Sequence, residues 1–165
     1  MAALEAGQTA PAFSLPLSSG GNFSLAEALR RGPVVLAFFK VSCPVCQFAF
    51  PYIERIHQAA KGKNITIIGV SQNTRADTEA FAREFRLTLP IALDDPSRYP
   101  VSNAYGLTNV PSVFYIAKDG EIEVSSVGWS KADLEQIARQ VGEQAPAEKV
   151  EFLRAGEDVP AFRAG

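Results

Sequence analysis

Two cysteines lie three positions apart, where an apolar stretch gives way to a helical pattern. They are Cys43 and Cys46 in the sequence FFKVSCPVCQFAF, and the chain contains no other cysteine. Cysteines at this spacing form a structural disulfide, contribute to a metal site, or act as a dithiol that exchanges electrons. Each of these chemistries needs different surroundings, so the rest of the sequence decides among them.

The composition is that of an ordinary globular protein with one core. The chain has 165 residues and a net charge of −2 with both signs interspersed, so it presents no basic surface for nucleic acid or an anionic membrane. We see no N-terminal signal, and no apolar run reaches the roughly 18 residues of a membrane span. A cytoplasmic location is therefore expected, with neither nucleic acid nor membrane as a partner. Because disulfides rarely persist in the cytoplasm, a purely structural bridge is disfavoured.

A metal site is disfavoured by the shortage of further ligands. A structural zinc needs four ligands and a catalytic zinc needs three from the protein, although a metal shared between two chains would need fewer from each. The one histidine, His57, follows Cys46 by eleven residues on the same expected helix, too far along the axis to share an ion. The sequence has no glycine-rich phosphate loop and no flavin signature. We therefore expect neither a metal nor an organic cofactor.

Apolar periodicity divides the chain into alternating strands and helices. Continuous apolar runs predict buried strands, and apolar residues at spacings of three and four predict helices. The resulting order predicts an α/β fold in which helices cover both faces of a mixed central sheet. The strands are expected at residues 34–40, 64–71, 89–94, 112–118 and 121–128, after an N-terminal hairpin that turns at 18–21, and the helices at 25–30, from the cysteines to near 62, and at 74–87, 97–105 and 130–144.

Cys43 falls at the junction between the first buried strand and the helix that follows. Unpaired backbone N–H groups and the helix dipole favour an anion there, which lowers the pKa expected for a thiol at this position. Cys46 lies one turn further on the same face, within reach of a disulfide with Cys43. Pro44 in the first turn costs no hydrogen bond. Lys40 either stabilises a thiolate on Cys43 or is an ordinary solvated lysine.

These features resemble the thioredoxin-like superfamily. The C-x-x-C after a strand, with Pro51 five residues beyond Cys46, and the segment NVPSVFYIAKDG are similar to its active-site helix and its cis-proline loop. The opening GQTAPAFSL and the helix inserted after the second strand resemble the redoxin branch (AhpC/TSA, TlpA-like). The resemblance covers about residues 5–143. It implies a cis peptide bond at Pro111 beside the active disulfide, and a backbone at Val110 that pairs with a bound peptide.

The resemblance also predicts the domain organisation. Residues 1–144 would form a thioredoxin-like redoxin domain with an inserted βα unit and an N-terminal β-hairpin extension at 11–32. Residues 145–165 would form a polar, extended C-terminal tail. The tail contains AGEDVPAF (155–162), which echoes AGQTAPAF (6–13). The echo is either a coincidence of loop composition or a sign that both segments pack Phe and Pro against the same kind of surface.

The chain departs from its relatives near the second cysteine. Thioredoxins carry a tryptophan where this chain has Ser42. The positions at which relatives place a buried acid are occupied by Ala37 and Ala49, so the group that would deprotonate Cys46 is not where the resemblance implies it. The nearest acid downstream, Glu54, is expected to be exposed.

Peroxiredoxins of the redoxin branch offer a second interpretation. They place a threonine three residues before the peroxidatic cysteine, which would be Cys46 here, and this chain has Cys43 at the threonine position. They also have a proline where this chain has Phe39. Two residues of the peroxidase pattern are missing, so peroxide reduction at Cys46 is the less favoured activity.

The favoured hypothesis is a thiol-disulfide oxidoreductase in which Cys43 attacks a substrate disulfide and Cys46 resolves the mixed disulfide. Its partners would be a protein or small-molecule disulfide (a peroxide in the second interpretation) and a thiol reductant that the sequence does not identify. A third hypothesis is a non-catalytic interaction module whose thiols are incidental. The residues expected to form the site are Cys43 and Cys46, supported by Lys40, Pro44, Val110 and Pro111.

Overall fold

The centre of the molecule is a mixed sheet of five strands. A computed structural model describes residues 3–165. From one edge to the other the strands are β5 (Ile91–Leu93), β4 (Thr66–Ser71), β3 (Val34–Phe39), β6 (Ser112–Ile116) and β7 (Ile122–Val127). The strands β3, β4 and β5 are mutually parallel, whereas β6 pairs antiparallel with both β3 and β7.

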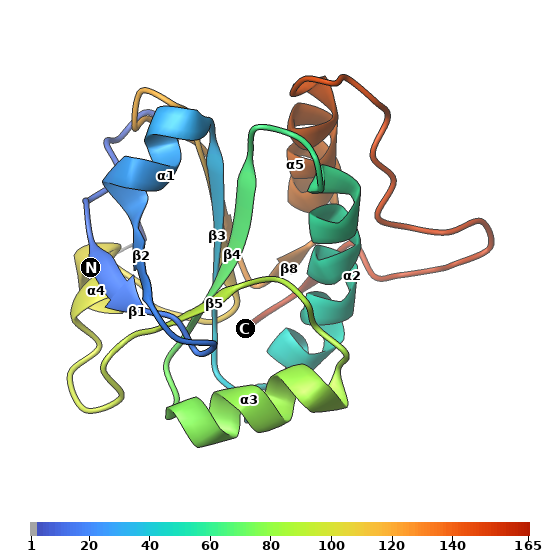
Figure 1. Ribbon diagram of the computed structural model, residues 1–165. Helices are drawn as coiled ribbons and strands as arrows, with labels where there is room; N and C mark the ends of the chain where they lie inside the picture. The colour runs from blue at the N-terminus through green and yellow to red at the C-terminus, as the bar shows by residue number, and fades with distance from the viewer. Residues whose placement is uncertain (1–2) are drawn as a thin grey trace.

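Helices cover both faces of this sheet, which confirms the predicted α/β architecture (Figure 1). None of the helices between residues 3 and 165 is long and apolar enough to cross a membrane. One face carries α1 (Leu25–Arg31) and α4 (Pro100–Ala104), and the core on the other face is built from α2 (Pro44–Ala60), α3 (Arg75–Glu84) and α5 (Lys131–Glu143).

The six residues of β3 are all buried because the strand separates two cores. Side chains of a strand point alternately to opposite faces. Val35, Ala37 and Phe39 therefore pack under α2 and α5, while the three residues between and before them pack under α1 and α4. This explains why the strand is apolar at every position instead of at every second one.

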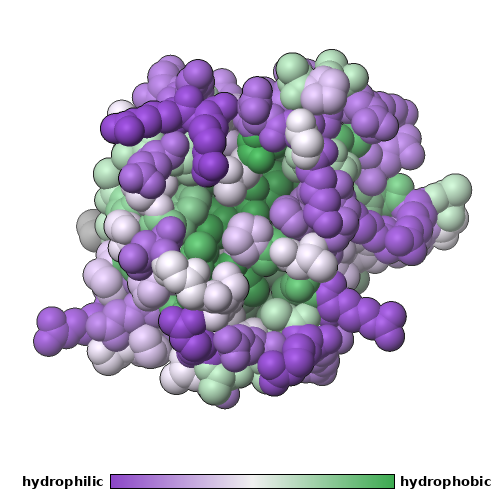
Figure 2. Space-filling model, viewed as in Figure 1, coloured by the Kyte–Doolittle hydropathy of each residue, from purple (hydrophilic) through white to green (hydrophobic). Residues whose placement is uncertain are grey.

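The N-terminal hairpin forms as predicted and covers part of the free sheet edge. The strands β1 (Ser14–Pro16) and β2 (Asn22–Ser24) pair antiparallel, and Ser24 then caps α1 by accepting a hydrogen bond from the Glu27 N–H. Beyond β1, Leu17 pairs with Ala92 of the edge strand β5. Apolar surface still shows over the middle of the face on which β5 lies, surrounded by hydrophilic side chains (Figure 2).

Residues 145–165 contain little regular structure, yet they are docked against the rest of the molecule. Their apolar side chains Val150, Phe152 and Val159 are buried in the core under α2 and α5. The segment ends in β9 (Phe162–Arg163), which pairs antiparallel with β8 (Trp129–Ser130). The tail is therefore held by packing as well as by polar contacts.

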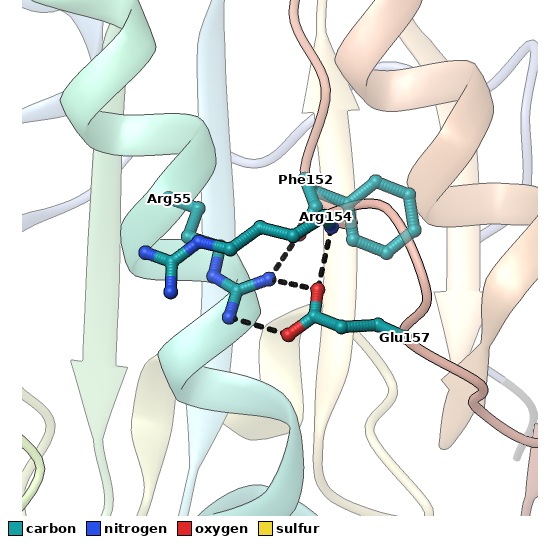
Figure 3. A network of polar contacts seen from close by, with 4 residues as sticks. All are labelled: Arg55, Phe152, Arg154 and Glu157. Atoms are coloured by element: carbon teal, nitrogen blue, oxygen red, sulfur yellow. Dashed lines mark hydrogen bonds and ion pairs between the residues drawn. The ribbon is translucent and has the colours of Figure 1, made fainter.

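A charged network anchors the tail to α2 (Figure 3). Arg55 donates through both Nη atoms to the carboxylate of Glu157, at 2.6 and 2.9 Å, and also donates to the Phe152 carbonyl at 2.9 Å. The backbone N–H of Arg154 donates to the same carboxylate. The hydrogen bond from Arg55, followed by that from Arg154, lowers the pKa of Glu157 to about 2.

The two similar octapeptides occupy partly similar environments. The carbonyl of Pro11 accepts a hydrogen bond from the Tyr105 hydroxyl at 2.8 Å, and the carbonyl of Pro160 accepts one from the Trp129 indole N–H at 2.7 Å. Both aromatic donors are fully buried. The phenylalanines at the octapeptide ends differ, because Phe162 is 60% exposed. The proline carbonyls thus bond to the same kind of buried aromatic donor, but Pro160 is itself exposed, so the two segments do not pack Phe and Pro alike.

The docking of the tail predicts that its two phenylalanines contribute very differently to stability. Phe152→Ala should lower the free energy of unfolding by about 3–5 kcal/mol, because the buried ring would leave a cavity beside Trp129 and Tyr52. The matched control, Phe162→Ala, should change it by less than about 0.5 kcal/mol. Urea denaturation followed by circular dichroism measures both. Equal effects would show that residues 145–165 are not docked.

The anchoring of the tail should also depend on pH through Glu157. Its pKa is about 2 when folded, against an ordinary value of 4.5, so the ion pair stabilises the docked tail fully above about pH 4.5 and is lost as the pH falls through about 2. Trp129, the single tryptophan, reports on the tail through its bond to Pro160. In Glu157→Gln we expect the Trp129 fluorescence change between about pH 5 and 2 to lose the part that is due to this ion pair. The control, Asp158→Asn at an exposed neighbouring position, should keep the whole change. An unchanged acid transition in Glu157→Gln would contradict this assignment.

Candidate active site

Cys43 is the N-cap residue of α2, and Pro44 is the first residue of the helix, as the sequence predicts. The Cys43 backbone is extended, with φ −82° and ψ 116°. Its Sγ accepts a hydrogen bond from the backbone N–H of Cys46 at 3.2 Å. The sulfur therefore takes the place of the serine or aspartate oxygen that caps many helices. A sulfur in this position faces the positive end of the helix dipole.

Two polar side chains that the sequence analysis did not single out hold the turn before Cys43. Gln47 donates from Nε2 to the Val41 carbonyl at 2.9 Å, and Asn73 accepts from the Val41 N–H at 3.0 Å. The Cys43 N–H donates to the Lys40 carbonyl at 3.2 Å. The turn is thus fixed from the helix and from the end of β4. The sequence feature that could have indicated this role is Gln47 itself, a polar residue directly after Cys46 and beside the apolar residues of the helix.

The cis-proline loop lies directly beside this helix terminus. The Val110–Pro111 peptide bond is cis, as the resemblance implies. The thiol of Cys43 donates to the Val110 carbonyl oxygen at 3.5 Å. The antiparallel pairing of β6 with β3 brings the two segments together, because it places Ser112 opposite Phe38. The Cys43 sulfur therefore contacts residues from two distant parts of the chain.

The two cysteines are free thiols in very different surroundings. Cys43 is half-buried, whereas Cys46 has no exposed surface. Burial raises the pKa of the Cys46 thiol well above its usual range, and a hydrogen bond to the Cys43 sulfur raises it further. One sulfur can thus meet a substrate, while the other is protonated and shielded one turn away. Of the two sulfurs, that of Cys43 is therefore the more accessible to a reaction partner.

No acid lies at the positions where the relatives place one beside the second cysteine. Ala37 and Ala49 are both buried in the core, so those positions are filled by methyl groups. The structure corrects the expectation for Glu54, which is 8% exposed instead of lying in solvent. Glu54 follows Cys46 by eight residues on α2, about 12 Å along the axis, so it is too distant to accept the Cys46 proton.

Glu54 has a structural role. Its carboxylate accepts hydrogen bonds from the backbone N–H groups of Thr88 and Leu89, from the Thr88 hydroxyl and from Gln58. Burial by itself would raise the pKa of Glu54, but these hydrogen bonds outweigh it, so the pKa is lowered. The carboxylate therefore ties α2 to the segment that leads into β5.

Lys40 lies next to the site, and its side chain extends over the ring of Tyr99. Its Nζ lies 5.6 Å from the centroid of that ring. A role in stabilising a thiolate on Cys43 stays a prediction. Lys40 also borders a polar pocket of about 220 Å³ that adjoins the cis-proline loop, lined by Lys40, Gln72, Tyr99, Ser102, Asn103, Leu107, Thr108, Asn109 and Val110.

The part of the chain from residue 3 onward contains no group of three or more His, Cys, Asp or Glu residues that could hold a metal ion. His57 lies in the last turns of α2, at the opposite end from the cysteines. The two thiols therefore lack the additional protein ligands that a zinc site requires within one chain.

Comparison with known proteins shows what the chain is similar to. The chain is 32% identical over 136 residues to the thiol-disulfide oxidoreductase ResA of Geobacillus kaustophilus, an alignment that covers 81% of this chain and 76% of that protein. Among solved structures, the thioredoxin domain of a thiol-disulfide oxidoreductase from Bacteroides vulgatus superposes with a TM-score of 0.73 at 23% identity, covering 83% of this chain and 97% of the other.

A peroxidoxin, BcpB of Mycobacterium tuberculosis, has the same fold. It superposes with a TM-score of 0.64 at 21% identity, covering 74% of this chain and 85% of that one. At this level of identity the likeness concerns the fold alone. A sequence model of the AhpC/TSA family matches residues 6–125, which span the hairpin, both cysteines and the cis-proline loop. The chain therefore belongs to the AhpC/TSA (redoxin) family and has its thioredoxin-like fold.

Proposed function

We propose that the protein is a thiol-disulfide oxidoreductase that passes two electrons through a reversible Cys43–Cys46 disulfide. One observation carries the proposal: the half-buried sulfur of Cys43 caps α2 and contacts Val110, while Cys46 lies buried one turn away. The similarity to ResA, which is named as an enzyme of this class, supports the same conclusion.

In the first step the Cys43 thiolate attacks one sulfur of a substrate disulfide. The N–H of Cys46 and the dipole of α2 stabilise the anionic sulfur, because a charge-assisted hydrogen bond is stronger than a neutral one. A Cys43–substrate disulfide forms, and the other substrate sulfur leaves as a thiolate that takes up a proton. The backbone of Val110 holds a substrate peptide in place during the attack, and the ammonium of Lys40 adds positive charge nearby.

In the second step Cys46 loses its proton and attacks the Cys43 sulfur. The Cys43–Cys46 disulfide forms, and the second substrate sulfur leaves as a thiolate, so the substrate gains the two electrons that the pair loses. A thiol reductant then restores the dithiol. The substrate is a protein or small-molecule disulfide. The proposal retains the cytoplasmic location, where the pair would be kept reduced between turnovers, and cell fractionation tests it.

Peroxide reduction is the second candidate, and the match to the AhpC/TSA family favours it. It would require Cys46 as the peroxidatic thiol. Cys46 has no exposed surface and a raised pKa, both of which disfavour attack on a peroxide by its thiolate. Disulfide exchange begins at Cys43 instead, so the burial and the raised pKa of Cys46 do not hinder the first attack.

The exchange mechanism predicts different consequences for the two cysteines. Cys43→Ser should reduce disulfide reduction to the uncatalysed rate, because the accessible nucleophile is lost. Cys46→Ser should accumulate a stable mixed disulfide on Cys43, detected by mass spectrometry. In the reduced wild type, iodoacetamide should modify Cys43 at least about 100-fold faster than Cys46, since each unit of pKa above the pH lowers the thiolate fraction tenfold.

The same variants separate the competing functions. Fast peroxide turnover by Cys43→Ser would establish Cys46 as a peroxidatic cysteine and overturn the proposal. Equal and slow alkylation of both thiols, with no turnover of any disulfide, would instead indicate an interaction module with incidental thiols.

The absence of an acid beside Cys46 predicts a steep pH dependence of the resolving step. Because the Cys46 pKa is raised, its thiolate fraction should increase about tenfold per pH unit between about pH 6 and 9, and the release of the second product should follow it. Rapid-quench analysis of the mixed disulfide measures this rate.

Ala49 offers a matched pair of variants for the same step. It lies three residues after Cys46, on the same side of α2. Ala49→Glu would supply a base and should accelerate resolution at neutral pH and flatten the pH profile. Ala49→Gln introduces the same bulk without a base, so it should keep the steep profile. A flat profile in the wild type would show that another group already accepts the proton.

A further inference from the structure

The last five residues, 161–165, run along the cis-proline loop, and we call them the C-terminal strap. The pairing of β9 with β8 and a hydrogen bond from the Lys131 N–H to the Ala161 carbonyl set its course. At its end, Asn109 donates from Nδ2 to the Gly165 carbonyl at 3.1 Å. Figure 1 shows the C-terminal end of the chain returning toward the start of α2.

The strap approaches Val110 so closely that only a glycine fits. A Cβ atom on Gly165 would overlap the Val110 carbonyl oxygen and lie 3.4 Å from the Asn109 Cβ. A Cβ atom on Gly128 would likewise overlap the carbonyl oxygen of Arg163. The strap backbone therefore rests against the same carbonyl group that the Cys43 thiol contacts.

The strap also contacts the other half of the active site. The guanidinium of Arg163 lies over the ring of Phe48, 5.0 Å from the centroid. Phe48 belongs to the start of α2, two residues after Cys46. The strap thus spans the helix that carries both cysteines and the loop that faces them.

The contacts of the strap are few and lie on the surface. All five of its residues are exposed, and the Phe162 ring is 60% exposed. It is held by the short pairing with β8, hydrogen bonds from Lys131 and Asn109, and the cation–π contact with Phe48. Segments with few buried apolar contacts open more readily than the core.

We propose that the strap occupies the position at Val110 that an extended polypeptide substrate would take. While the strap is closed, the dithiol reduces only small disulfides. Polypeptide disulfides are reduced after the strap opens. This inference rests on the proposed function, in which substrate peptides pair with the Val110 backbone. Gly165 already lies against that carbonyl, so a peptide strand and the strap compete for one position.

In this proposal small substrates approach through the polar pocket that adjoins the loop. Its lining includes Val110, whose carbonyl the Cys43 thiol contacts, and none of the strap residues lines it. Its remaining lining is mostly amide and hydroxyl groups, with Lys40 as its cation. A small disulfide with carboxylate and amide groups, such as oxidised glutathione, matches this lining. Reducing it would oxidise one Cys43–Cys46 dithiol per substrate and release two thiols.

The test compares two substrates in single turnovers of the reduced protein, residues 1–165. One substrate is oxidised glutathione and the other is an extended peptide with an internal disulfide. Gly165→Val should displace the strap, because its added atoms would overlap the Val110 carbonyl. Arg163→Gln should weaken closure without adding bulk near Val110. The matched control is Ala155→Val, an exposed tail position away from the loop.

We expect both strap variants to raise the second-order rate constant for reduction of the peptide about tenfold. This increase corresponds to a wild type in which the strap is open, and the site can bind a peptide, for about one-tenth of the time. The rate with oxidised glutathione should stay unchanged, as should both rates in Ala155→Val. An unchanged or lower ratio of peptide to glutathione rates in both strap variants would overturn the role of the strap. Failure of the wild type to reduce either disulfide would instead overturn the proposed function.

Discussion

The Cys43 sulfur is the point at which the two halves of the site depend on each other. It accepts the N–H of Cys46 and donates to the carbonyl of Val110, so one atom both starts α2 and contacts the cis-proline loop. If the helix began one residue later, Cys46 would rotate by about 100° around the axis and leave the reach of its partner. Ionisation of Cys43 removes the proton that Val110 accepts. The carbonyl is then left facing an anion, which favours its pairing with a donor from a substrate backbone.

The helix that carries Cys46 and the C-terminal tail are connected through the aromatic side of α2. Phe48 and Tyr52 pack on the Trp129 ring at 4.8 and 5.3 Å, and Phe152 from the tail packs on the same indole at 6.3 Å. These rings form a continuous layer from the first turns of α2 to the tail, in which Trp129 and Phe152 are buried and Phe48 and Tyr52 are half-buried. Since close-packed interiors transmit small displacements, the position of the tail bears on the start of the helix that carries both thiols. The tail is in this sense part of the environment of the site.

Local patterns in the sequence were enough to predict the strands of the central sheet, the helices and the placement of Cys43, because caps and apolar periodicity involve residues within about four positions of each other. The pairing of β8 with β9 was not predicted. The cis bond at Pro111 followed from resemblance and not from spacing. Contacts between distant residues were not predictable: Arg55 and Glu157 are 102 positions apart, and Glu54 meets Thr88 across 34. From a single sequence, a charged residue is predicted to be exposed, because a partner that is distant along the chain cannot be identified. The tail was predicted to be polar and extended for the same reason. Its buried residue Phe152 has charged residues close to it in the sequence, which conceal its role in the core.

The similarity between the two octapeptides, 6–13 and 155–162, explains how the strap can open while the rest of the tail stays docked. Gly7 and Gly156 both have positive φ, of 94° and 83°, and each octapeptide then presents a proline carbonyl to a buried aromatic donor. A short strand follows the first octapeptide and another begins at the last residue of the second. Each strand pairs with the residues that cap a helix, β1 with β2 before α1, and β9 with β8 before α5. The two ends then diverge. After the first proline the strand pair buries Leu15 and Phe23, whereas after the second the chain exposes Phe162. Because the Pro160 anchor and the buried Val159 precede the strap, release of residues 161–165 leaves both of these contacts in place.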